Sequence, residues 1–168
     1  PSFFDIISNE RLVRCFHPLS LDERFPVRIV STGLRDIIMP ISAPNVLETV
    51  VPDFNEISIL SKEMKCIGIH CFALTESDID NASTAVCRNF APLYGINEEA
   101  ATGTSNCALA CYLHNLGIRP QRYIFEQGHN LSSVSRIIVE LKTDSDILGV
   151  RVGGDGIIEG ILDKDIIS

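Results

Sequence analysis

Two acidic residues stand directly before a turn of small and hydroxyl-bearing residues in this sequence. Residues 95–106 read Gly-Ile-Asn-Glu-Glu-Ala-Ala-Thr-Gly-Thr-Ser-Asn, with the acids at Glu98 and Glu99. The turn leads into an apolar stretch, 107–113, and the next glycine is Gly117. Backbone N–H groups at the start of a helix, with the positive end of the helix dipole behind them, can bind a carboxylate or a phosphate. The segment therefore predicts an anion site at a helix start.

Each residue of this turn has a chemical role in such a site. Gly103 lets a ligand approach the backbone closely, and Thr102, Thr104 and Ser105 add hydroxyl groups to it. Glu99 stands nearby as an acid, a base or a hydrogen-bond acceptor. A purely structural interpretation stays open, because acidic residues favour helix N-termini and Thr and Ser cap them.

The elements that must position this turn are a buried helix and many short strands. Residues 107–113 have no polar face, which is typical of a helix buried on all sides, with Thr102, Thr104 or Ser105 as N-cap and Gly117 after its end. The pattern predicts an α+β fold in which a curled, mostly antiparallel sheet, a half-barrel, wraps around that central helix. The expected strands are 27–31, 35–41, 66–74, 86–91, 122–126, 136–143, 148–152 and 157–162, with a helix in two pieces over 45–63, broken at Pro52.

Composition and net charge limit the classes of partner that this chain could bind. The 168 residues are 45% hydrophobic and carry a formal net charge of -8, which disfavours nucleic acid and anionic membrane surfaces. No apolar run reaches the length of a transmembrane helix. The chain opens at Pro1 without an initiator Met or a signal peptide. We expect residues 1–24 to be a connector from an upstream domain and residues 25–168 to form one domain.

The six cysteines are expected to be reduced thiols, most of them in the core, in a cytoplasmic protein. A metal site is the alternative, since Cys107 and Cys111 lie at i, i+4 on the helix and His70 precedes Cys71. No Cys-x-x-Cys pair occurs, and neighbouring residues of a strand point to opposite faces. We therefore expect no metal.

Three other residues have a structural and a functional interpretation. Arg88, at the start of a strand, either binds a carboxylate or makes a structural ion pair. His129 is a turn residue or faces the cleft, and His70 is a satisfied core or sheet histidine.

Five segments, in the right order, resemble the PhzF (phenazine-biosynthesis-like) family. In words, the family pattern is Arg-x-Phe-Ala-Pro, Gly-Ile, then Glu-Asp-Pro-Ala-Thr-Gly-Ser before an apolar helix. The resemblance covers about residues 20–162. The matching segments are Ser31-Thr32-Gly33-Leu34, Arg88-Asn89-Phe90-Ala91-Pro92, Gly95-Ile96 with Glu98-Glu99-Ala100-Ala101-Thr102-Gly103-Thr104, Glu126-Gln127-Gly128 before Ser135-Arg136, and Val152-Gly153-Gly154.

The resemblance implies a diaminopimelate-epimerase-like fold of two similar domains, with the active site in the cleft between them and no cofactor. It implies a proton shift within a small carboxylate-bearing substrate, carried by a Glu beside a Gly-Asn-Pro motif of the N-terminal domain. These 168 residues contain no such motif. The resemblance makes Glu99 and Thr104 the candidate catalytic residues, and Thr102, Gly103, Thr104 and Ser105 the candidate substrate-binding residues.

Three departures from the family pattern occur in this turn. Glu99 replaces an Asp, Ala100 a Pro, and Thr104 a Ser. Epimerases of this fold that use cysteine carry Cys-Gly-Thr or Cys-Gly-Ser, where this chain has Thr102 at the first position. Threonine supplies no thiolate near neutral pH, so a single-base proton shift is favoured over two-base racemisation. A thiol-dependent epimerase would need Cys107 to face the ligand, and its place about one turn into the helix predicts a core thiol.

The sequence thus predicts the C-terminal half of a PhzF-like isomerase, inactive alone, whose partners are a small-molecule carboxylate substrate and the missing N-terminal domain. A homodimer is left open. The alternative is a non-catalytic domain that binds a small carboxylate and lacks the acid/base Glu.

Overall fold

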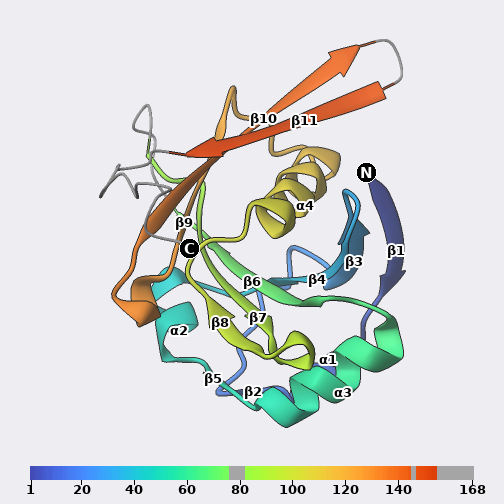
Figure 1. The fold of residues 1–168 in the computed structure, drawn as a ribbon, viewed down its shortest axis with the longest axis vertical. Helices are drawn as coiled ribbons and strands as arrows, with labels where there is room; N and C mark the ends of the chain where they lie inside the picture. Colours follow the sequence, from blue (N-terminus) through green and yellow to red (C-terminus); the bar gives the residue numbers. More distant parts are fainter. Residues whose placement is uncertain (76–81, 145–146, 155–168) are drawn as a thin grey trace, which may run out of the picture.

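The computed structural model describes residues 1–75, 82–144 and 147–154. Short helices are interspersed among a larger number of strands along these residues (Figure 1). The helices are α1 (Asn9–Leu12), α2 (Pro44–Thr49), α3 (Phe54–Met64) and α4 (Gly103–Asn115). The strands are β1 (Ser2–Ile6), β2 (Phe16–His17), β3 (Arg28–Ser31), β4 (Arg35–Pro40), β5 (Val51–Pro52), β6 (Gly68–Leu74), β7 (Ala85–Ala91), β8 (Ile96–Glu99), β9 (Tyr123–Gln127), β10 (Ser135–Asp144) and β11 (Ile147–Gly154).

One sheet curls around α4, as predicted (Figure 1). Its order is β1-β3-β4-β6-β7-β9-β10-β11, and β8 pairs with β7 beside this path. Neighbours are antiparallel except for β4 with β6 and β7 with β9. Parallel pairing requires a crossover: α2 and α3 lie between β4 and β6 in the chain, and α4 lies between β7 and β9. The α+β half-barrel is confirmed, and a second, similar domain stays a prediction.

The central helix is buried on all sides. Every residue from Ser105 to Leu113 is buried, which follows from the lack of a polar face in 107–113. The helix contacts β3, β4, β10 and β11. Gly117, with φ of 89°, turns the chain after the helix. The predicted helix is therefore enclosed by the sheet, and the strands around it can fix the position of its N-terminal turn.

The sheet separates two apolar cores. Residues of one strand alternate between its faces: Ile38 packs with α4, whereas Ile37 and Met39 pack with the side chains of α1, α2 and α3. No helix in the described part of the chain is long and apolar enough to cross a membrane.

Strands form in two segments where the sequence pattern predicts none. Residues 1–24, expected as a connector, contribute β1 to the main sheet. Leu12 and Phe16 are buried in the core that contains Ile37 and Met39, on the side of the sheet away from α4. Residues 96–99, expected only as the approach to a helix, form β8. The strand expected over 157–162 lies outside the described residues. Gly153 and Gly154 belong to β11.

Truncating a leucine in the middle of α4 should be costly. Leu109 is fully buried, so Leu109→Ala leaves a cavity and should lower the free energy of unfolding by about 2–5 kcal/mol. Urea unfolding followed by circular dichroism measures this. The control is Leu116→Ala, because Leu116 follows the same helix and is 38% exposed. A loss below about 1 kcal/mol for Leu109→Ala would contradict the burial of the helix.

Candidate functional site

The two adjacent acids on β8 have different environments, because consecutive residues of a strand face opposite ways. Glu98 accepts two hydrogen bonds from the Arg88 guanidinium, at 2.8 and 2.9 Å. Arg88 also donates to the carbonyls of Leu47 and Val50. This buried, bidentate pair ties β7 and β8 to α2. Arg88 is therefore a structural ion-pair residue, and only Glu99 is left for the other face.

Glu99 is held by one of its two carboxylate oxygens. The Thr102 hydroxyl donates to Oε2 at 2.5 Å, and the Asn89 amide lies 3.5 Å from the same oxygen. Glu99 pairs with Asn89 across β8 and β7, which sets this contact. Oε1 accepts no hydrogen bond from any residue that the structure describes. One oxygen thus fixes the side chain, and the other remains available as an acceptor or base.

The loop between β8 and α4 is held in place by Gln127 of β9. Its Nε2 donates to the Glu99 carbonyl at 2.7 Å and to the Thr102 hydroxyl at 3.0 Å. Its Oε1 accepts from the Asn106 amide at 2.9 Å. All three residues lie around the first turn of α4, so this buried amide fixes the loop relative to the helix.

Gly128 completes this contact. It has φ of +93°, and a Cβ there would lie 2.2 Å from the Ser133 carbonyl oxygen and 3.0 Å from that of Ala100. Only glycine allows this close approach. The Glu126-Gln127-Gly128 segment therefore presses β9 against the turn that precedes α4.

The first backbone N–H groups of α4 have no acceptor among the described residues. Thr102 is the N-cap, but its hydroxyl bonds to Glu99 and makes no capping bond. The first helical N–H to find an acceptor is that of Asn106, which bonds to the Thr102 carbonyl. Among the described residues nothing accepts from the N–H groups of Gly103, Thr104 and Ser105. Three donors at the positive end of a helix can serve an anion.

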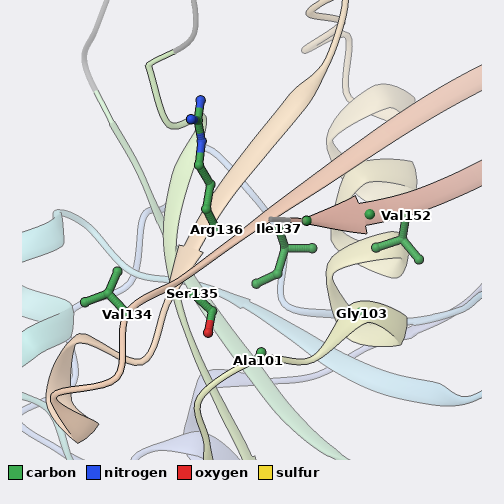
Figure 2. Close-up of a pocket in the computed structure, with 9 residues that line it drawn as sticks. Ala101, Gly103, Val134, Ser135, Arg136, Ile137 and Val152 are labelled. Atoms are coloured by element: carbon green, nitrogen blue, oxygen red, sulfur yellow. The ribbon is translucent and has the colours of Figure 1, made fainter. Parts of the chain in front are cut away.

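Every predicted site residue lines one open pocket of about 550 Å³. Thr104 is exposed there, and Ser105 lies at the bottom of the first turn, almost fully buried. A second pocket of about 500 Å³ shares Ala101, Gly103 and Val152 with it, so the two form one cleft over the start of α4. Figure 2 shows the second pocket, with Ile137 and Val152 over Gly103 and Arg136 pointing away.

Cys107 also lines the larger pocket, while its side chain packs in the core around α4. Burial, with a smaller contribution from nearby Cys111, raises the pKa of this thiol to about 11. The thiol is neutral near pH 7, which disfavours the thiol-dependent alternative. The other five cysteines are buried and unpaired. His129 pairs with Glu126 at 3.1 Å and lines neither pocket.

Sequence reasoning missed a set of buried polar residues between the sheet and the first turn of α4. We call them the polar seam: Asp36 of β4, His70 of β6, Asn89 of β7 and Gln127 of β9. Each lies within or near the end of a strand that is otherwise mostly apolar. A polar residue within such a strand is a signal, because burying it requires a hydrogen-bond partner.

His70 takes part in this seam as a neutral donor. Burial lowers the pKa of His70 to about 4, against the smaller effect of its hydrogen bonds. Its Nδ1 lies 3.1 Å from Oδ1 of Asn89. The Asn89 amide nitrogen faces Glu99, so its oxygen faces His70, and we assign the histidine proton to Nδ1. A chain of hydrogen bonds thus runs from His70 through Asn89 to Glu99.

Asp36 is the most unusual member of the seam. Its side chain is 1% exposed; Oδ2 accepts from the Ser105 hydroxyl at 3.0 Å, and Oδ1 has no partner within the described part of the chain. Burial raises the pKa of Asp36 from its usual 3.8 to about 6; the Ser105 hydrogen bond lowers it, and the charge of Glu99 raises it. A buried carboxyl without a cation is most stable with its proton.

The fold and cleft define a half-barrel α+β domain with an open pocket at the start of its central helix. The family model of phenazine biosynthesis-like proteins (PhzC-PhzF) matches residues 7–160. The chain belongs to this family, as its sequence motifs indicated.

Solved and curated relatives agree with this assignment. The chain is 29% identical over 93% of its length to an uncharacterised isomerase of Clostridium acetobutylicum, of which it covers 55%, and 30% identical over 83% to one of Deinococcus radiodurans, of which it covers 46%. It aligns over 91% of its length with a PhzF-family protein of Bacillus anthracis, covering 54% of that chain, at 26% identity and a TM-score of 0.79. The chain spans about half the length of the curated relatives it matches.

Replacing Asp36 by Asn should stabilise the chain at high pH. The folded-state pKa of Asp36 is raised to about 6, so its contribution to stability is full below pH ~4 and is lost as the pH rises through ~6. At pH ~8, Asp36→Asn should therefore unfold with a free energy up to about 3 kcal/mol higher than wild type. His70 acts in the opposite pH direction but is common to both proteins, so it cancels in the difference.

Urea unfolding at pH ~4.5 and pH ~8 measures this difference. The control is Asp5→Asn, the same change at an exposed position of β1, which should leave stability within about 0.5 kcal/mol. An Asp36→Asn variant less stable than wild type at pH ~8 would show that the fold needs the charge of Asp36.

Proposed function

We propose that this chain is the carboxylate-binding half of a PhzF-like isomerase that shifts a proton within a small carboxylate-bearing substrate. The observation that carries the proposal is that Glu99 lines one pocket together with Gly103, Thr104 and Ser105, whose N–H groups have no acceptor among the described residues. Membership of the PhzC-PhzF family, and relatives that are named isomerases, support the reaction class.

The substrate carboxylate would lie over the first turn of α4. It would accept from the N–H groups of Gly103, Thr104 and Ser105, and from the exposed Thr104 hydroxyl. Gly103 would allow the close approach, since its position carries no side chain at the junction of the two pockets. Thr102 would act indirectly, because its hydroxyl is bonded to Glu99.

Glu99 would face the reacting part of the substrate. Its Oε2 is anchored, so Oε1 would accept a hydrogen bond from a substrate hydroxyl or amine, or exchange a proton with it. In the proton shift itself, a carboxylate of the N-terminal domain would remove a proton from one carbon and return it to another. The substrate keeps its atoms and electrons, so the reaction needs no redox partner.

The cleft has an apolar rim that a second domain would cover. Leu34, Tyr94, Ile96 and Val152 line the larger pocket and are well exposed. Apolar side chains gathered around a polar pocket are typical of a surface that packs against a partner. Together with the half-length match to its relatives, this supports an N-terminal domain as the partner that closes the site.

A second candidate function is binding at the same cleft without catalysis. A non-catalytic domain that binds a small carboxylate would use the same helix start. It would give no exchange of substrate protons with any partner domain, and this is what the first test measures.

Exchange of substrate protons tests the half-site. We expect the 168-residue chain to give no deuterium incorporation into candidate 2-amino-3-hydroxy carboxylates in D₂O, since the shuttling Glu is not in it. Joined to the N-terminal domain of a two-domain relative, it should incorporate deuterium. In that protein Glu99→Gln should lower turnover by about 10²–10⁴-fold and leave carboxylate affinity nearly unchanged or higher.

The matched control is Glu10→Gln, the same change at an exposed position of α1, which should keep full turnover. Robust turnover by the chain alone would contradict the half-site. Absence of exchange in the joined protein, with carboxylate binding retained, would favour the non-catalytic function.

Substitutions in the first turn of α4 test the anion site. Thr104→Val removes one hydroxyl, and should weaken carboxylate binding by about 0.5–1.5 kcal/mol, or up to about 3 if the hydroxyl meets the carboxylate directly. Gly103→Val should abolish binding, because its branched side chain would fill the junction beside Val152. Acetate titrations followed by amide shifts measure both. Unchanged affinity in Gly103→Val would place the carboxylate elsewhere.

A further inference from the structure

We infer that Asp36 is a positioning residue that decides whether the Ser105 hydroxyl donates to a ligand in the cleft or only accepts from it. The site at the start of α4 then binds anions well when Asp36 carries a proton and poorly when it does not. This inference rests on the proposed function of that site, and it adds a residue outside the pocket lining that governs its preference for anions.

The placement of Asp36 comes from its strand. Asp36 pairs with Val30 of β3 and Gly68 of β6, and its side chain shares the face of Ile38, which packs with α4. A Cβ on Gly68 would lie 2.0 Å from the Phe90 carbonyl oxygen, so only glycine fits beside Asp36 on β6. On the α4 side of the sheet Asp36 meets Ser105, which lines the larger pocket. Ser105 therefore stands between the buried carboxyl and the ligand.

The single proton of the Ser105 hydroxyl makes this contact directional. When Asp36 is ionised, both of its oxygens can only accept, so the Ser105 proton points to Asp36 and the hydroxyl offers only lone pairs to a ligand. When Asp36 is protonated, its Oδ2–H can donate to Ser105 Oγ, and the Ser105 proton is free to bond an anion. Protonation of Asp36 thus removes a charge and adds a donor to the site.

The groups around Asp36 favour the protonated state. From β8, the charge of Glu99 raises the pKa of Asp36, and from α4 the Ser105 hydroxyl lowers it. Cys66, just before β6, is a neutral thiol whose pKa is about 12, and His70 on β6 is neutral, with a pKa of about 4. Arg35 precedes Asp36 on β4 and stacks over the Phe4 ring at 4.0 Å. No ion pair to Asp36 forms among the residues that the structure describes.

Sulfate binding at two pH values tests the inference, because sulfate keeps its double charge from pH ~5 to pH ~8. The probe is sulfate added to the 168-residue chain at constant ionic strength, and the readout is the amide shift of Gly103, Thr104 and Ser105. In the wild type we expect affinity on the order of tenfold higher at pH ~5 than at pH ~8. The midpoint should coincide with the titration of the Asp36 carboxyl carbon in the same sample.

Three variants separate the hydrogen bond from the charge. Asp36→Asn should bind tightly at both pH values, since the carboxamide N–H can donate to Ser105 as the protonated acid does. Ser105→Ala should bind weakly at both, with most of the pH dependence lost although Asp36 still titrates. Asp5→Asn, the same change on exposed β1, should keep the wild-type profile.

Each unfavourable outcome has a distinct meaning. Sulfate binding that is independent of pH in the wild type, or equally dependent on pH in Asp36→Asn, overturns the role of Asp36 and leaves the anion site in place. Full pH dependence in Ser105→Ala shows that Asp36 acts by charge alone and overturns the role of Ser105. Absence of any sulfate shift at the first turn of α4, at either pH, overturns the proposed site and the inference together.

Discussion

The burial of the first turn of α4 against the curled sheet is the constraint on which the rest of the site depends. A helix start carries free N–H groups, and its neighbours Ser105 and Asn106 are polar and buried. Polar groups away from water must be hydrogen-bonded. The sheet meets part of this requirement with the polar seam, in which each of four neighbouring strands contributes one side chain to the space beneath the helix start. Within the described residues, Asp36 Oδ1, His70 Nε2 and Asn106 Oδ1 still have no hydrogen-bond partner.

The seam positions the loop at the cleft because its side chains hydrogen-bond the loop groups that face the sheet. The Gln127 amide donates to the Glu99 carbonyl and the Thr102 hydroxyl, and the Asn106 amide donates to the Thr102 carbonyl. With the loop held by these bonds, residues 103–105 line the cleft, and no described residue accepts from their N–H groups. The common function of these contacts explains why the Glu-Gln-Gly segment and the Thr-Gly-Thr turn, far apart in the sequence, belong to one pattern.

The local parts of this arrangement could be predicted from the sequence, and the non-local ones could not. The apolar run 107–113 predicts a buried helix by its lack of a polar face, and the alternating strands predict the half-barrel. β8 was missed because its side chains are mostly polar and it pairs on one side only, with β7. The partners of Asp36 and Gln127 lie on elements distant in the chain, and no local pattern encodes them.

The acidic residues near the proposed anion site would repel an anionic ligand, and the fold places each of them in a different environment. Within the part of the chain that the structure describes, the carboxyl groups of Asp36, Glu98 and Glu99 lie near the start of α4, and each negative charge would oppose an anionic ligand. Glu98 is neutralised by Arg88 on the far face of β7. Asp36 is buried without a cation, which favours its protonated form near pH 6 and below. Of these three acids, Glu99 has one oxygen that accepts no hydrogen bond from a described residue, and it shares the pocket with residues 103–105 at the start of the helix. The alternation of β8 and the burial of Asp36 thus leave Glu99, of these three acids, as the one that would face an anionic ligand in the proposed site.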